Sequence, residues 1–266
     1  MAITLDLSDH VVLVTGGVRG IGAGITRAFL DAGATVVTCA RHEPEEPVRA
    51  GDNTAHFTAA DVRDADRVQE LVRGIVAEHG RLDIVVNNAG GSPYALTAEG
   101  SPRFHSKVVD LNLLAPLNVA QAANAVMQDQ DGGGLILMIS SVSAHRASPG
   151  TAAYGAAKAG LENLTRTLGV EWAPRVRVNG VTVGMVRTEQ AHLQYGDEEG
   201  VRSVARTVPL GRLAEPADIG ACCVFLASPM ATYVNGATLL VDGGGERPAF
   251  LDAATANREA ETPGEE

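Results

Sequence analysis

The sequence contains few cysteines, few aromatic residues and no long apolar run, and each shortage excludes a class of protein. Three of its 266 residues are cysteines, Cys39, Cys222 and Cys223, and they lie in apolar segments without metal-ligand spacing. This usage argues against a disulfide scaffold or a cysteine-based metal site, and it indicates a reducing compartment. No stretch reaches the ~18 apolar residues of a membrane span and no signal peptide begins the chain, so we expect a soluble, cytoplasmic protein.

Charge and composition narrow the possibilities further. The formal net charge of −11 at pH 7 argues against nucleic acid or an anionic membrane as a partner. Aromatic residues make up 4% of the chain and hydrophobic residues 45%, so the core should consist mostly of Ala, Val, Leu and Ile. At this length, one α/β domain is the natural size.

Lysine is also scarce, with two residues against 19 arginines, and one of the two follows a tyrosine at helical spacing. Tyr154 and Lys158 lie in residues 151–172, whose pattern predicts a helix, so both side chains should share one face. An ammonium beside a phenol stabilises the phenolate and lowers the phenol pKa. The pair is therefore a candidate acid/base group that exchanges a proton near neutral pH; a surface tyrosine and a solvated lysine are the alternative.

Apolar, β-branched runs alternate with segments of helical periodicity along the chain. We expect strands over 10–15, 34–40, 53–58, 82–86, 135–140, 175–181 and 238–241, and helices over 23–32, 64–79, 104–127, 151–172 and 216–227. This alternation predicts an α/β fold with a doubly wound parallel sheet of about seven strands.

A glycine-rich turn joins the first strand to the first helix. Gly16, Gly20 and Gly22 form a Gly-x-x-x-Gly-x-Gly pattern, and Arg19 lies within it. Glycines permit close backbone approach, and the helix N-terminus offers free N–H groups to a diphosphate. Strand, glycine turn and helix together predict a Rossmann-like dinucleotide site.

The residues that would face the adenosine ribose are basic. The second strand ends at Ala40 and is followed by Arg41, where an NAD enzyme often has an acid that binds the ribose 2′-hydroxyl. Arg41 and Arg19 would suit a 2′-phosphate, so NADP(H) is favoured as the cofactor and NAD(H) remains possible. Two ordinary surface arginines are the alternative.

Further polar residues follow strands or interrupt helices. Asn87 and Asn88 follow the fourth strand and could cross-link neighbouring loops, and Asn112 interrupts a helical segment. Ser141 follows the fifth strand, where a serine could bind a substrate carbonyl or cap the next turn. Residues 189–208 are polar and poorly periodic, which is typical of a mobile lid.

Together these motifs resemble the classical short-chain dehydrogenase/reductase (SDR) family over residues 8–245. The resemblance rests on Thr-Gly-x-x-x-Gly-Ile-Gly at 15–22, Asp-Val at 61–62, Asn-Asn-Ala-Gly at 87–90, Asn112, and Ser141 thirteen residues before Tyr154, followed by Lys158. It implies an NAD(P)(H)-dependent oxidoreductase that interconverts a ketone and a secondary alcohol. It also implies one domain over 1–245, with the lid inside it. The polar, acidic composition of residues 246–266 predicts a tail that is disordered at its end.

The resemblance assigns roles to individual residues. Tyr154 would exchange the proton, Ser141 would bind the substrate oxygen, Lys158 would hold the nicotinamide ribose, and Asn112 would anchor a water beside Lys158. The residues expected at the cofactor are Gly16, Arg19, Gly20, Ile21, Gly22, Arg41, Asp61, Val62, Asn88, Ala89, Gly90, Tyr154, Lys158, Gly184, Val186 and Thr188. Because the family usually has Pro-Gly where this chain has Val183-Gly184, we expect a looser turn there.

The substrate is less well defined than the reaction. The lid and the loop 91–102 mix apolar and polar residues without a basic cluster, which favours a mostly apolar carbonyl such as a 3-oxoacyl thioester, a steroid or terpenoid ketone, or a polyketide. An NAD-dependent alcohol or hydroxysteroid dehydrogenase working oxidatively, and a non-catalytic dinucleotide-sensing protein, are the alternatives. The resemblance also implies a homotetramer or homodimer. We expect no metal site.

Overall fold

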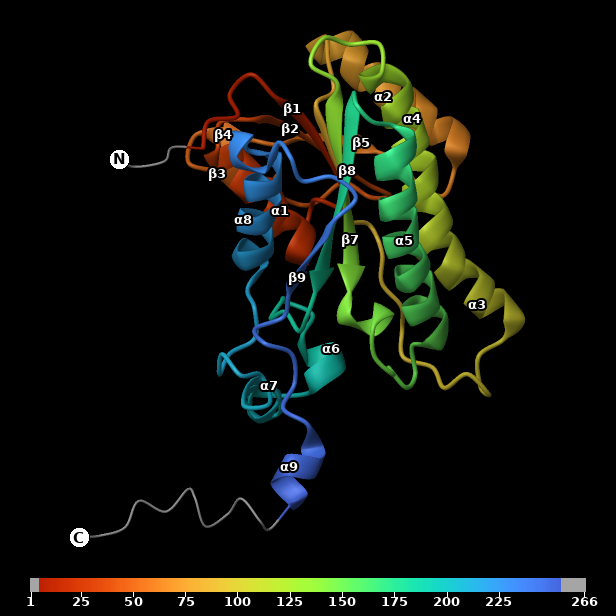
Figure 1. Cartoon of the computed structure of the whole chain (residues 1–266), viewed down its shortest axis with the longest axis vertical. Helices are drawn as coiled ribbons and strands as arrows, with labels where there is room; N and C mark the ends of the chain where they lie inside the picture. The colour runs from red at the N-terminus through yellow and green to blue at the C-terminus, as the bar shows by residue number, and fades with distance from the viewer. Residues whose placement is uncertain (1–4, 255–266) are drawn as a thin grey trace, which may run out of the picture.

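The computed structural model describes residues 5–254 of the chain, and within them seven parallel strands form one sheet (Figure 1). In spatial order these are β5 (His56–Ala59), β2 (Thr35–Ala40), β1 (Val11–Thr15), β6 (Ile84–Asn87), β7 (Gly134–Ser141), β8 (Val176–Val183) and β9 (Thr238–Val241). The prediction of a doubly wound parallel sheet in a single domain is confirmed. The strand order reverses between β1 and β6, which is where ligands bind in such sheets.

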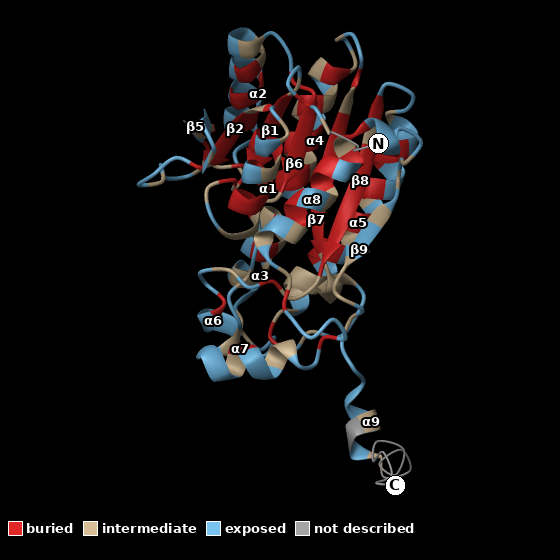
Figure 2. Cartoon of the chain, turned by 90° about the vertical axis from the view of Figure 1, so that its left-hand side faces the viewer, coloured by how far each residue is buried: buried red, intermediate tan, exposed pale blue. Residues whose placement is uncertain are grey.

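Helices cover both faces of the sheet. One face carries α1 (Gly20–Asp31) and α8 (Pro216–Ala227), and the other carries α2 (Ala65–His79), α4 (Ala115–Met127) and α5 (Ala152–Glu171). Figure 2 shows the buried strands between these helices, whose outward sides are exposed. Among the described residues, the helices lack the length and apolar character needed to cross a bilayer.

The residues of strand β1 contribute to the apolar cores on both faces of the sheet. All five of its residues are buried, so a continuous apolar run replaces the alternation of a half-exposed strand. Val12 and Val14 pack with α1 and α8, whereas Val11 and Leu13 pack with α2 and α4. Successive side chains point to opposite faces of a strand, so a single valine-rich run fills both layers.

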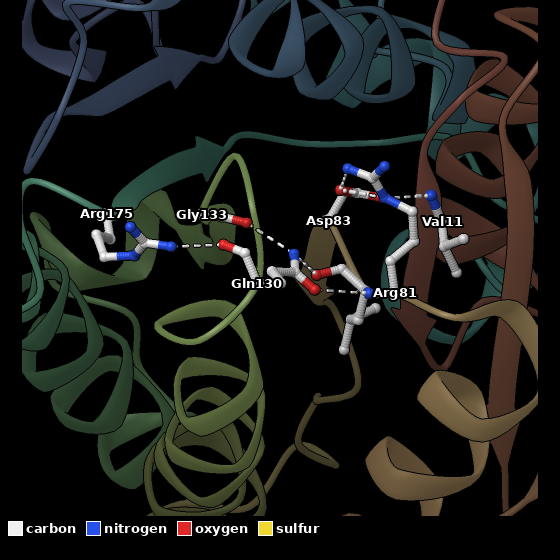
Figure 3. A network of polar contacts seen from close by, with 7 residues as sticks. Val11, Arg81, Asp83, Gln130, Gly133 and Arg175 are labelled. Carbon is white, nitrogen blue, oxygen red and sulfur yellow. Dashed lines mark hydrogen bonds and ion pairs between the residues drawn. The ribbon is translucent and has the colours of Figure 1, made fainter.

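The amino ends of the strands are tied together by polar side chains (Figure 3). Asp83 accepts a hydrogen bond from Val11 N at 2.8 Å and is held by the Arg81 guanidinium. The Gln130 side chain accepts a hydrogen bond from the main chain just ahead of β6. The main-chain carbonyl of Gln130 accepts a hydrogen bond from Arg175 Nη2 at 2.6 Å. Side-chain hydrogen bonds therefore hold the amino ends of the strands together. The loops that carry the candidate site lie at the carboxyl ends of the strands.

Two elements differ from their predicted form. The strand expected over 53–58 is split into β4 (Asn53–Thr54), which pairs antiparallel with β3 (Arg49–Ala50) in a separate hairpin, and β5 in the main sheet. Gly51, with φ +55°, makes the tight turn of that hairpin. The helix expected over 104–127 is interrupted: α3 (Pro102–Val109) and α4 flank a π-helical turn, η1 (Asp110–Leu114). The other expected strands and helices begin and end within a few residues of their predicted bounds.

The expected lid contains two short helices, α6 (His192–Tyr195) and α7 (Glu198–Ala205), beyond the carboxyl ends of the strands (Figure 1). They surround a small apolar cluster centred on Val201, Val208 and Leu213. The remaining short elements are η2 (Val142–Ala144), η3 (Pro229–Ala231) and α9 (Ala249–Ala253). The disorder expected at the end of the tail concerns residues outside the described part of the chain, and the division after residue 245 stays a prediction.

Candidate active site

The glycine turn between β1 and α1 depends on its glycines. Gly16 and Gly20 have φ +63° and +52°, in the left-handed region that favours glycine. A Cβ on Gly22 would lie 2.1 Å from Gly16 O, so a side chain there would push the turn apart. The turn therefore brings bare backbone to the amino end of α1, as the sequence predicts.

The amino end of α1 accepts an anion. The Gly20 N–H donates to Glu189 Oε1 at 2.9 Å. A carboxylate oxygen at this N–H demonstrates that there is room and a donor for an anionic oxygen at the helix start. The residues present thus fit the diphosphate of a dinucleotide.

Asn88 and Thr15 fasten the glycine turn to the end of β6. Asn88 Nδ2 donates to Thr15 O at 2.9 Å and to Gly16 O at 3.2 Å. Thr15 Oγ1 accepts from the main-chain N–H groups of Asn88 and Ala89, each at 3.0 Å. The prediction that the paired asparagines include a cross-link between loops is confirmed for Asn88, and its place beside a ribose stays a prediction.

Basic residues surround Asp61 at the carboxyl end of β5. Hydrogen bonding from Arg63 holds the pKa of Asp61 below its usual range, and the charge of Arg41 contributes more weakly in the same direction. Arg41 and Arg19 are exposed, as a 2′-phosphate site requires, and Val62 is buried. Arg63 escaped the sequence reasoning, although the Asp-x-Arg spacing directly after a strand is a usable signal.

Ser141, Tyr154 and Lys158 come together where β7 ends against α5. Lys158 is 3% exposed; its Nζ donates to Ile139 O at 2.7 Å and lies 5.6 Å from the centroid of the Tyr154 ring. The Ser141 hydroxyl lies close enough to the Tyr154 phenol to lower its pKa in part. The spacing that singled out these three residues therefore corresponds to one cluster in space.

The protonation of this cluster differs from the prediction. Burial raises the pKa of Tyr154, and the hydrogen bond to Ser141 offsets only part of that rise. Burial also lowers the pKa of Lys158 to about 8. The expectation of a lowered Tyr154 pKa is wrong for this structure, because the phenol is withdrawn from water while the Lys158 ammonium binds the Ile139 carbonyl. At neutral pH the phenol keeps its proton.

Asn112 explains the π-helical turn. Its Nδ2 donates to Val108 O at 2.8 Å and Gly91 O at 2.9 Å, and its Oδ1 accepts from Gly91 N at 2.8 Å. Because the side chain binds the carbonyl four residues back, the regular helical ladder is displaced there. A Cβ on Gly90 would lie 2.7 Å from Asn112 Oδ1 and 3.4 Å from Lys158 Nζ, so all three adjoin. A water held between Asn112 and Lys158 stays a prediction.

The turn after β8 is fixed rather than loose. A Cβ on Gly184 would lie 2.7 Å from Asp242 Cα, so the segment packs tightly on the end of β9. Ala214 N donates to Met185 O at 3.0 Å, and Arg187 N donates to Ala214 O at 2.8 Å. These bonds, together with buried Val186, replace the stiffness that a proline would give. Thr188 then lies against Gly20 of the glycine turn.

A buried carboxylate behind the site was not foreseen. Glu162 accepts from Ser140 Oγ at 2.8 Å and from Thr182 Oγ1 at 2.7 Å, and it is 2.9 Å from His145 Nε2. Glu162 stands one helical turn after Lys158, which was the available signal, since that face of α5 must pack on the sheet. It ties β7, β8 and the loop after Ser141 together.

Apolar side chains stand exposed on the loops expected to wall the substrate pocket. Tyr94 and Leu193 are 71% and 72% exposed, and Leu96 is exposed as well; Leu210, just beyond the lid, is also exposed. Ala95 N donates to Gly150 O at 2.9 Å, which fastens the loop 91–102 to the segment just ahead of α5. An apolar surface thus borders the segment that leads to Tyr154.

One group of metal-ligating side chains lies away from these residues. The ligand atoms of His56, Glu78 and His79 lie within 4.8 Å of one another, at the start of β5 and the end of α2. Parallel strands place their carboxyl ends at one edge, so this group sits at the opposite edge from the glycine turn. It shares no residue with the candidate active site.

Known proteins resemble this chain in both sequence and fold. The family model described as enoyl-(acyl carrier protein) reductase matches residues 16–246. An uncharacterised oxidoreductase of Mycobacterium tuberculosis is 37% identical over 243 residues, covering 90% of this chain and 92% of its own. A 3α-hydroxysteroid dehydrogenase of Mediterraneibacter gnavus is 35% identical over 247 residues, covering 89% and 97%.

A solved structure agrees with these matches. The ligand-free aldohexose dehydrogenase of Thermoplasma acidophilum superposes with a TM-score of 0.83 and 29% identity, covering 90% of this chain and 94% of its own. These relatives are named for a steroid and a sugar substrate, so they agree on the kind of reaction and differ in what is reduced or oxidised.

Proposed function

The chain belongs to the short-chain dehydrogenase/reductase family of NAD(P)(H)-dependent oxidoreductases that act on CH–OH groups, and from this premise we propose that it is an NADP(H)-linked reductase of a mostly apolar ketone. The observation that carries the proposal is the cluster of half-buried Tyr154 and Ser141 with buried Lys158, in which the raised pKa keeps the phenol protonated. The cluster stands at the carboxyl ends of the strands, which is also the end of the sheet where the glycine turn lies.

The proposed chemistry divides between cofactor and protein. A nicotinamide dinucleotide supplies the hydride when bound. The Tyr154 hydroxyl gives its proton to the carbonyl oxygen, so hydride and proton together convert the ketone into a secondary alcohol. The Ser141 hydroxyl donates a hydrogen bond to that oxygen and stabilises the charge that develops on it. The Lys158 ammonium lies close enough to stabilise the phenolate that remains.

The protonation of Tyr154 supports the reductive direction. A proton donor must be protonated before the reaction, and a phenol whose pKa lies above its ordinary value meets this condition at neutral pH. Alcohol oxidation needs the phenolate as a base, which the raised pKa disfavours until the pH is alkaline. An oxidative, NAD-dependent enzyme is thus the weaker candidate at neutral pH.

The preference for NADP(H) rests on charge. Arg41 and Arg19 are exposed near the expected adenosine end, and no acid ends β2 to bind a ribose 2′-hydroxyl. Titration with NADPH and NADH tests the assignment, with Arg41→Ala as the variant and Arg27→Ala, an exposed arginine on α1, as the matched control. We expect Arg41→Ala to weaken NADPH binding about tenfold and to leave NADH unchanged. A preference for NADH that Arg41→Ala does not alter would refute it.

The apolar substrate class rests on the exposed side chains of Tyr94, Leu96, Leu193 and Leu210, and the hydroxysteroid dehydrogenase among the relatives supports it. A panel consisting of a steroid ketone, a 3-oxoacyl thioester, a diketide and an aldohexose, with NADPH or NADP⁺ absorbance followed, tests it. We expect an apolar ketone to give the highest kcat/KM. An aldohexose as the best substrate would contradict the proposal.

Residues around β9 support the family's usual assembly, a homotetramer. Tyr233 is fully exposed, and Val170 and Leu240 are exposed as well. Asn235 Nδ2 donates to Gly169 O at 2.7 Å, which joins the segment after Tyr233 to the part of α5 that carries Val170. Apolar side chains grouped in this way favour burial against another copy of the chain. Light scattering during gel filtration should give four chain masses; a single chain mass at micromolar concentration would exclude both tetramer and dimer.

A further inference from the structure

Within the described residues, no side chain next to the start of α1 in the sequence caps the amino end of this helix. The N-cap residue, Arg19, is extended (φ −155°, ψ 167°), its side chain makes no capping bond, and the first turn contains no acidic residue. A helix start carries free N–H groups and partial positive charge. An anion bound here must therefore come from elsewhere in the chain or from a ligand.

In this structure the anion is a side chain of the segment that follows β8. Glu189 Oε1 accepts the Gly20 N–H at 2.9 Å although 169 positions separate the two residues. Gly20 has no side chain to keep the carboxylate away, and Thr188 lies against the same glycine. We name this contact between Glu189 and Gly20 the latch.

We propose that Glu189 competes with the dinucleotide diphosphate for the Gly20 N–H and thereby sets the affinity for the cofactor. This inference rests on the proposed function, because it takes the glycine turn as the diphosphate site. A single N–H at a helix start cannot serve both groups, and a carboxylate beside a diphosphate is repelled. Dinucleotide binding therefore requires the latch to open.

The latch also connects the cofactor site to the lid. The Glu189 carbonyl accepts from His192 Nδ1 at 3.1 Å, and Thr188 O accepts from Ala191 N at 3.0 Å, so Glu189 is continuous with the start of α6. Opening the latch frees the beginning of the lid at the moment when the cofactor arrives. By linkage, whatever holds the lid in its latched position weakens dinucleotide binding by the same factor.

Two substitutions at Glu189 test this competition. Glu189→Gln removes the charge and keeps an acceptor, and Glu189→Ala removes both. Glu198→Gln is the matched control, because Glu198 is an exposed lid carboxylate bonded to Arg187 at 3.0 Å rather than to the glycine turn. Dissociation constants for NADPH are measured at fixed ionic strength, and unfolding temperatures verify that each variant is folded.

A second ligand separates local competition from a general change in charge. Adenosine 2′-phosphate carries the adenine and the 2′-phosphate but lacks the diphosphate that would meet Gly20. We expect both Glu189 variants to bind NADPH about fivefold or more tightly than the unaltered protein, whereas binding of adenosine 2′-phosphate stays within about twofold. Glu198→Gln should change neither constant by more than about twofold.

The outcomes separate this inference from the proposed function. If the unaltered protein binds NADPH and both Glu189 variants bind it equally or more weakly, the latch is not a competitor, while the proposed function stands. An equal gain for adenosine 2′-phosphate would also overturn the inference, since the effect would then be general. If no variant binds NADPH or NADH, the inference and the proposed function fail together.

Discussion

Replacing Lys158 with methionine should stabilise the fold while removing a group that the proposed chemistry needs. Lys158 is 3% exposed, and burial lowers its pKa from 10.5 to about 8. The charged form is therefore less favourable in the folded protein than in the unfolded chain. A methionine of similar length carries no charge to desolvate.

The size and the pH dependence of this effect follow from the pKa. A shift from 10.5 to about 8 corresponds to roughly 3 kcal/mol. Below pH 8 both states carry the ammonium and the full cost is present; it fades as the pH rises from 8 to 10.5, because the folded protein loses its proton first. Methionine forfeits the hydrogen bond to Ile139 O, which costs about 2 kcal/mol while the amine is charged and about 1 kcal/mol once it is neutral. The net gain is about 1 kcal/mol at pH 7, with a loss of about 1 kcal/mol above pH 10.5.

Urea unfolding of the unaltered protein and Lys158→Met at pH 7 and pH 10.5 measures both ends of this range. The other lysine, Lys107, is exposed, so Lys107→Met provides the control and should shift the free energy of unfolding by less than about 0.5 kcal/mol at either pH. A variant that is less stable than the unaltered protein at pH 7, or a difference that does not change with pH, would refute the reasoning.

Three further predictions concern the same site. Asn112→Ala should lower the free energy of unfolding by about 2–3 kcal/mol in urea titrations, because both main-chain groups of Gly91 lose their partner; an effect below about 0.5 kcal/mol would contradict this. The reductive kcat/KM should be level near neutral pH and fall above about pH 8, where the Lys158 ammonium is lost, and a rise with pH would contradict the sign. Gly22→Ala should weaken NADPH binding at least tenfold, since its Cβ would meet Gly16 O at 2.1 Å, whereas Gly74→Ala, which points into open space, should not.

The sheet and the position of the site could be predicted from local pattern. Strand β1 is buried on both faces and is therefore a continuous apolar run, and the glycine turn follows it directly. Because parallel strands end at one edge, the residues after β6 and β7 were bound to meet there. Tyr154 and Lys158 needed only helical spacing to share a face.

What the pattern could not supply depends on contacts between distant segments. Glu189 reaches Gly20 across 169 positions, and no spacing rule connects them. The direction of the Tyr154 pKa shift depends on how deeply the phenol is buried and on the carbonyl that the Lys158 ammonium binds. The π-helical turn likewise arises where Asn112 binds Val108 O four residues back, while the same side chain is held by Gly91 in a loop that precedes α3.

The split of the segment 53–58 has a local cause that was missed. Gly51, at φ +55°, turns the chain so that Asn53 and Thr54 pair antiparallel with β3, and the chain then continues into β5 of the main sheet. A glycine two residues ahead of an expected strand was a hairpin signal, and the apolar pattern on either side was too short to reveal it.

The central claim is that Tyr154 delivers a proton to a ketone oxygen beside a dinucleotide held by the glycine turn. The most direct measurement compares the unaltered protein with Tyr154→Phe, using NADPH and the best ketone of the panel, with NADPH binding measured in parallel. The account predicts an NADPH dissociation constant within about twofold and a turnover rate lower by about 10³-fold or more. A variant that retains more than about a tenth of the rate, while binding NADPH normally, would contradict it.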